Sequence, residues 1–243
     1  MRKSCLNSKA LITKIATNLV LSVLIFSIGA LCLSSTEKDI TADVEQPGVY
    51  RFAENGKGVS LMFNVYWGTE EVYDILKILE KHEAKATFFI GGCWADDNVE
   101  CLKAIHDAGH EIGNHGYFHK DHAKLDLVSN QREMTQCNQF IELAIGEKIT
   151  LFAPPSGAYG NATLSACKAL GMRTILWSKD TIDWRDKDSA LIYKRATSDV
   201  KKGDFILMHP MQATVDALDD VLVHYETLDL ETITVSENLQ ENG

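Results

Sequence analysis

The stretch Asn114-His115-Gly116-Tyr117-Phe118-His119-Lys120-Asp121-His122 follows a short segment, residues 111–114, that is typical of a strand. Two histidines four positions apart beside a glycine indicate a metal site on the turn after this strand, because a neutral imidazole offers one ring nitrogen to a cation such as Zn²⁺. The alternative is a solvated or structural loop that happens to be rich in histidine. The rest of the chain adds weight to the metal site.

On both sides of this stretch, short apolar runs alternate with amphipathic segments. This alternation predicts an α/β fold with a parallel sheet, and the number of units favours a distorted parallel (β/α) barrel with seven or eight strands. The expected strands span residues 59–65, 86–90, 111–114, 149–152, 174–177, 205–208 and 232–235. The expected helices span residues 70–82, 98–108, 128–145, 163–170, 189–200 and 214–225.

Polar or proline-rich groups follow five of the expected strands. In parallel barrels the chemistry gathers at the carboxyl ends of the strands, so these groups are expected to meet at one end of the fold. They comprise residues 64–68, His115 with His119, residues 153–157, residues 180–184, and His209-Pro210.

The charge distribution separates an N-terminal segment from the rest of the chain. The chain has 24 Lys and Arg and 34 Asp and Glu residues; four of the basic residues and none of the acids precede residue 35, which leaves 20 against 34, a net −14. This acidity argues against a nucleic-acid partner. The four cations precede a mostly apolar run at residues 19–33. Residues 1–34 are therefore expected to be a signal peptide or an N-terminal membrane anchor, so that the protein is exported and either secreted or membrane-anchored.

A polar connector is expected at residues 35–56, with Pro47-Gly48 and Asn55-Gly56 as turn signals, and a single domain at residues 57–240. In an exported chain Cys93 and Cys101 can pair as a disulfide or remain free thiols, and the sequence leaves both open.

The ordered motifs resemble the polysaccharide deacetylases, carbohydrate esterase family 4 with its NodB-homology domain, over residues 58–239. His115 and His119 match the family's metal-binding histidines, with Gly116 where a hydroxyl residue is usual. The sequence Asp180-Thr181-Ile182-Asp183-Trp184 matches the Asp-x-x-Asp-Trp motif, and Ile206-Leu207-Met208-His209 matches the Leu-x-x-His motif. The resemblance implies a NodB-like barrel.

Two family motifs are altered. The usual Thr-Phe-Asp-Asp-Gly, which supplies the general base and a metal ligand, reads Met62-Phe63-Asn64-Val65-Tyr66-Trp67-Gly68, a Trp-Gly variant similar to that of the sporulation-associated branch of the family. The usual Arg-x-Pro reads Ala153-Pro154-Pro155. In the family the arginine pairs with the base. Losing both halves of such a pair avoids the roughly 3–5 kcal/mol cost of leaving one buried charge unpaired.

The resemblance implies metal-dependent deacetylation of an N-acetylated glycan, peptidoglycan or chitin-like, by hydrolysis of an acetamide C–N bond. His115 and His119 would hold a divalent metal, zinc with cobalt, nickel or manganese as alternatives, and Asp121, His122 or a water would complete its shell. His209 would act as general acid, oriented by Asp180 or Asp183, and Asn64 would occupy the place of the base.

Glycan contacts are expected from side chains in the altered and matched motifs, namely Tyr66, Trp67, Pro155, Ser156 and Trp184. The aromatic residues among them can equally be core, and Asp183-Trp184 can be a cap and core pair. The alternative function is a catalytically silent glycan-binding pseudoenzyme on the same fold, because the base and one metal ligand are missing.

Overall fold

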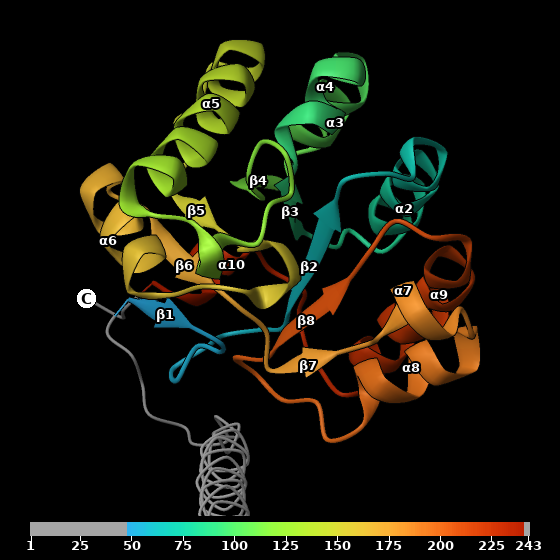
Figure 1. Ribbon diagram of the computed structural model, residues 1–243. Helices are drawn as coiled ribbons and strands as arrows, with labels where there is room; N and C mark the ends of the chain where they lie inside the picture. Colours follow the sequence, from blue (N-terminus) through green and yellow to red (C-terminus); the bar gives the residue numbers. More distant parts are fainter. Residues whose placement is uncertain (1–47, 241–243) are drawn as a thin grey trace, which may run out of the picture. The chain divides into compact units, whose positions relative to one another are not determined.

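The computed structural model describes residues 48–240 and contains an eight-stranded sheet in which every strand pairs in parallel with its neighbours. The strand order is β1-β6-β5-β4-β3-β2-β8-β7 (Figure 1). The strands are β1 Val49–Tyr50, β2 Ser60–Val65, β3 Ala86–Ile90, β4 Glu111–Asn114, β5 Leu151–Phe152, β6 Arg173–Ile175, β7 Lys179–Asp180 and β8 Phe205–Met208. The predicted distorted parallel (β/α) barrel is confirmed.

Helices cover the outside of the sheet, and most connections between successive strands run through them (Figure 1). The exceptions are β1 to β2 and β6 to β7, which are joined without a helix. The helices are α2 Thr69–Lys81, α3 Gly92–Asp97, α4 Val99–Asp107, α5 Leu127–Ile145, α6 Asn161–Leu170, α7 Asp183–Asp186, α8 Ser189–Thr197, α9 Gln212–Thr227 and α10 Val235–Asn238, with short 3₁₀ turns η1 at His122–Lys124 and η2 at Pro155–Gly157. The longest, α5, begins after Asp126, whose carboxylate accepts the Ser129 N–H at 2.7 Å, and ends at Gly146 in a left-handed conformation.

The central strands are buried on both faces, and their residues divide between two apolar clusters. Leu61, Phe63 and Val65 of β2 pack into the outer cluster beneath the helices, whereas Met62 packs into the inner cluster. Because successive side chains of a strand point to opposite faces, Asn64 shares the inner face with Met62. The interior of the curved sheet is therefore a packed core that reaches up to the candidate site.

The expected last strand at residues 232–235 is wrong. Thr232 forms only an isolated parallel bridge with Val59, and Thr234 then caps α10. Thr234 and Glu237 form a capping box, a local signal for a helix start that overrides the alternating Ile233 and Val235. Val235 enters the inner cluster, so α10 contributes to the core.

The expected connector at residues 35–56 extends too far along the chain. Val49 and Tyr50 form β1 and pair with Thr174 and Ile175 at the edge of β6, because this short apolar pair can use the open hydrogen-bonding groups of that edge. The start of the chain, including the expected signal or anchor, lies outside the described residues. Between residues 48 and 240, no helix is long and apolar enough to cross a membrane.

Cys93 and Cys101 are free thiols, which resolves the alternative left open by the sequence. Cys93 lies at the start of α3 and is half-buried. Cys101 is buried in α4, with its Sγ 3.9 Å from the Thr69 carbonyl oxygen. The two thiols therefore lie in different environments and do not form a disulfide.

Candidate active site

His115 directly follows β4 and is almost fully buried. Its Nδ1 lies 2.7 Å from the carbonyl oxygen of Ala153, which accepts the Nδ1–H and leaves Nε2 with a free lone pair. Burial, reinforced by the neighbouring His119, lowers the pKa of His115 to about 3. The ring is therefore neutral at pH 7, which is the form that binds a metal.

His119 lies beside His115, with 5.1 Å between the ring centroids and an interplanar angle of 70°. Burial lowers its pKa as well, so both rings are neutral near pH 7. Two imidazoles on one tetrahedral metal, with metal–nitrogen bonds of about 2.0–2.1 Å, have centroids about 5 Å apart. The ring spacing matches that of two ligands of one metal ion.

Asp121 and His122, which the sequence suggests as a third ligand, do not form a three-ligand cluster with the histidine pair in the described part of the chain. Asp121 accepts the Ala123 N–H at 3.1 Å and pairs with Lys124 at 2.8 Å. His122 is fully buried, with its Nδ1 2.7 Å from Oδ1 of Asn130, and its Nε2 has no hydrogen-bond partner among the described residues. Within residues 48–240 no cluster of three His, Cys, Asp or Glu side chains could hold a metal. The donor set is two neutral nitrogens without an anion, which suits a weakly held ion.

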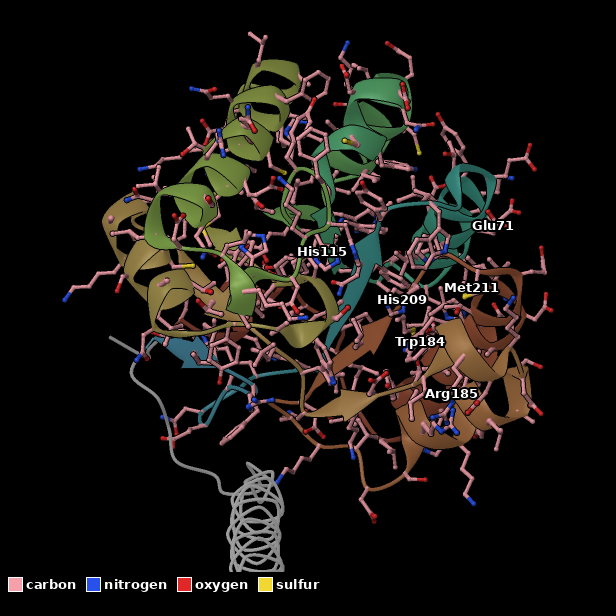
Figure 2. The ribbon with its side chains drawn as sticks, viewed as in Figure 1. Glu71, His115, Trp184, Arg185, His209 and Met211 are labelled. Atoms are coloured by element: carbon pink, nitrogen blue, oxygen red, sulfur yellow. The ribbon has the colours of Figure 1, made fainter. Side chains whose placement is uncertain are left out.

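His209 follows β8 and forms a dyad with the buried carboxylate of Asp183. Its Nδ1 lies 2.8 Å from Asp183 Oδ1, and its backbone N–H donates to Oδ2 at 2.6 Å. The same carboxylate accepts the Trp184 N–H at 2.8 Å and the Thr214 hydroxyl at 2.7 Å. With four donors around it, Asp183 fixes the imidazole through Nδ1 and leaves Nε2 out of this contact. Figure 2 shows His115 and His209 at the same end of the sheet, on either side of β2.

Of the two aspartates considered as the orienting group, the structure selects Asp183. Asp180 instead accepts the Ile182 N–H at 2.8 Å. Burial raises the pKa of Asp180, and the nearby His209 works in the opposite direction. Asp180 therefore borders the site without a direct bond to the imidazole.

Asn64 occupies the carboxyl end of β2 and is 3% exposed. Its Oδ1 is buried and finds no hydrogen-bond partner among the described residues. Val65 points into the outer apolar cluster, so a carboxylate at this position would enter the core and not the site. Ala153 is buried in the inner cluster and contributes only its carbonyl oxygen.

Aromatic side chains border the histidines. The indole of Trp67 lies parallel to the His209 ring, at 5.7 Å and 4°, and is 42% exposed. Tyr66 contacts His119 at 4.9 Å between ring centroids. Trp184 is exposed, Pro155 is buried and Ser156 is exposed. The exposed indoles of Trp67 and Trp184 can therefore stack on a flat apolar face of a ligand.

Two contributors escaped the sequence analysis. Thr214, at the start of α9, completes the shell of Asp183. Glu133, on the buried face of α5, accepts the Phe118 N–H at 2.8 Å. Its position in helical register with Met134, Cys137 and Ile141 was the available signal, because a carboxylate on an apolar stripe requires a polar partner.

The geometry is that of a barrel with a histidine pair and a His–Asp dyad at the carboxyl ends of its strands. The Polysaccharide deacetylase family profile matches residues 53–175, and the chain belongs to this family. The uncharacterized protein YlxY of Bacillus subtilis is 35% identical over 87% of this chain and 66% of its own length. The peptidoglycan-N-acetylmuramic acid deacetylase PdaA of the same organism is 29% identical over 61% of this chain and 58% of its own.

Solved structures share the fold and part of the sequence. A CE4 family pseudoenzyme from Bacillus anthracis has a TM-score of 0.77 and 34% identity, over 81% of this chain and 70% of that protein. A mutant of it with restored enzymatic activity has a TM-score of 0.77 and 33% identity, over 81% and 72%. The chain thus spans no more than about two thirds of YlxY and PdaA.

Proposed function

We propose that this domain binds an N-acetylated glycan, of the peptidoglycan or chitin type, and slowly hydrolyses its acetamide C–N bond with the help of a divalent metal. The observation that carries the proposal is the complete His209–Asp183 dyad opposite a histidine pair, combined with a carboxamide at Asn64. The side chains that would serve as acid and metal ligands are present, and a carboxamide stands where the base would be.

His115 and His119 would hold the metal, zinc with cobalt, nickel or manganese as alternatives. When bound there, such an ion supplies Lewis-acid polarisation of the acetyl carbonyl. Burial lowers the pKa of His115 and of His119, so both imidazoles are neutral near pH 7 and need not release a proton before they bind a metal.

His209 would donate a proton from Nε2 to the departing amine, while Asp183 stabilises the ring through Nδ1. Water adds across the C–N bond, giving acetate and a free amine. The Asn64 carboxamide cannot accept the proton that the water loses, and a missing general base costs about 10²–10⁴ in rate. Slow turnover follows from that single position.

Trp67 and Trp184 would stack on sugar rings beside the histidines, and Tyr66, Pro155 and Ser156 would make further glycan contacts. We further propose that residues 1–34 export the protein and keep it secreted or membrane-anchored, outside the cytoplasm and close to the cell-wall glycan. The deacetylases among its relatives are named for peptidoglycan, which agrees with this location.

A second candidate, a catalytically silent glycan-binding protein, is favoured by the buried and unpartnered Oδ1 of Asn64. This oxygen is an acceptor that the acetamide N–H of a bound glycan would satisfy, without any proton transfer. The likeness to the Bacillus anthracis pseudoenzyme supports the same candidate.

Acetate release and glycan binding, measured on the same purified protein, separate the two. N-acetylglucosamine oligomers and peptidoglycan fragments are incubated with zinc or with a chelator. Slow release that the chelator abolishes supports the deacetylase, and binding without release supports the silent protein. If the protein neither binds these glycans nor releases acetate, both candidates are refuted.

A further inference from the structure

A buried carboxylate on α5, Glu133, contacts the loop that carries His119. Glu133 is 2% exposed. Its Oε2 accepts the Phe118 N–H at 2.8 Å, and its Oε1 pairs with the Lys120 ammonium at 2.7 Å. One carboxylate therefore holds the residue before His119 and the residue after it.

The loop needs such a support, because His119 has a φ of +51°, a conformation that residues with a side chain rarely adopt. Its earlier part is anchored to the start of α3: the Gly92 N–H donates to the Gly116 carbonyl oxygen and the Cys93 N–H to that of Tyr117, both at 3.0 Å. Beyond residue 117 these backbone anchors stop.

From Phe118 to Lys120, Glu133 supplies the hydrogen bonds to the rest of the described domain. Lys120 also lies over the Phe118 ring, with its Nζ 5.0 Å from the ring centroid. The ammonium that pairs with Glu133 therefore also contacts the side chain of Phe118.

We propose that Glu133 is the positioning residue of His119, and that it sets the affinity of the His115–His119 pair for a divalent cation. This inference rests on the metal site of the proposed function. The competing explanation is that the ion pair only fastens α5 to the domain, in which case its loss lowers stability and leaves metal affinity unchanged.

The test uses Glu133→Gln and Glu133→Ala, with Glu142→Gln as matched control. Glu142 lies on the same helix and also accepts a backbone N–H, that of Ile149 at 2.9 Å, away from the histidines. Zinc affinity is measured by competition with a chromophoric chelator, and hydrogen exchange of the Phe118 amide is measured without metal.

Loss of a partner that orients a metal ligand typically lowers metal affinity about 10–100-fold. We expect that loss for Glu133→Ala and a smaller one for Glu133→Gln, whose amide oxygen can still accept the Phe118 N–H. Phe118 exchange should accelerate in both, and Glu142→Gln should change neither measurement. Unchanged zinc affinity in Glu133→Ala, or an equal loss in Glu142→Gln, would overturn the inference.

If Glu133→Ala does not fold, Lys120→Met replaces it, since that side chain is half-exposed, with Lys124→Met as its control at the surface pair with Asp121. Weaker zinc binding in Lys120→Met alone supports the inference, and equal binding in both overturns it. If the wild type binds no zinc, the metal dependence of the proposed function fails. Exchange at Phe118 then still decides whether Glu133 holds the loop.

Discussion

Replacing Asp183 by asparagine should destabilise the domain measurably, although the two side chains have nearly the same shape. The carboxylate is fully buried and accepts two backbone N–H groups, those of Trp184 and His209, together with the His209 ring and the Thr214 hydroxyl. An amide keeps one acceptor oxygen and presents an NH₂ group on the other side.

In either orientation of the amide, one backbone N–H faces a donor and loses its acceptor. The Thr214 hydroxyl can rotate and the imidazole can exchange tautomers, whereas a backbone N–H can do neither. A buried donor without an acceptor costs about 1–3 kcal/mol. With an m-value of about 1–3 kcal/mol per molar urea, the unfolding midpoint should fall by roughly 1 M.

The assay is equilibrium unfolding in urea of the wild type, Asp183→Asn and Asp188→Asn. Asp188 caps α8 by accepting the Leu191 N–H at 3.0 Å, and aspartate and asparagine are about equally good in that role, so the control should unfold near the wild-type midpoint. An Asp183→Asn midpoint indistinguishable from the wild type would refute the view that this carboxylate organises the site.

Three further predictions follow from the same structure. Gly116→Ala should destabilise the domain by about 1–2 kcal/mol because residue 116 has a φ of +74°. It should destabilise more than Gly146→Ala, since Gly146 has a φ of +77° but open space around it, whereas a Cβ at residue 116 would lie 3.0 Å from Nε2 of His122. Equal unfolding midpoints of the two variants would contradict the close contact. Burial, helped by the charge of Lys85, lowers the pKa of His110 to about 4. Between pH 6.5 and pH 4 the unfolded state therefore binds a proton that the folded state does not, so the stability should fall as the pH drops through this range. In unfolding experiments His110→Leu should flatten this fall by up to about 1.4 kcal/mol per pH unit, and an unaltered pH profile would count against the prediction. Ala153→Arg alone should destabilise the domain, because its cation would enter the inner apolar cluster. Adding Asn64→Asp should restore part of the stability, with a coupling free energy of about 0.5–3 kcal/mol between the two substitutions. Strictly additive effects on the unfolding free energy would show that the two positions do not interact.

The elements that the sequence predicted well are those whose signal is a buried apolar run or an amphipathic period. Residues 86–90, 111–114 and 205–208 coincide with β3, β4 and β8. The strands β1 and β7 have two residues each, too few for a periodic pattern, and depend on pairing with distant partners. The segment at 232–235 failed because a local capping box outweighed alternation.

The positions of the candidate site residues at strand ends followed from motif order, whereas their contacts did not. Spacing could not separate Asp180 from Asp183 as partner of His209, since Asp180 ends β7 and Asp183 lies only three residues further on. Nor could it reveal that Val65 faces the outer core, or that Glu133 supports the loop through a backbone N–H. Such contacts depend on how α5 and the loop pack in three dimensions.

The most direct test of the account is acetate release from N-acetylglucosamine oligomers by the wild type, Asn64→Asp, and the pair Asn64→Asp with Ala153→Arg, each saturated with zinc. If the missing base limits the reaction and needs its arginine, the double variant should exceed the wild type by about 10²–10⁴ in turnover, and Asn64→Asp should fall well short of it. A wild type as fast as the double variant, or Asn64→Asp alone reaching that rate, would contradict the account.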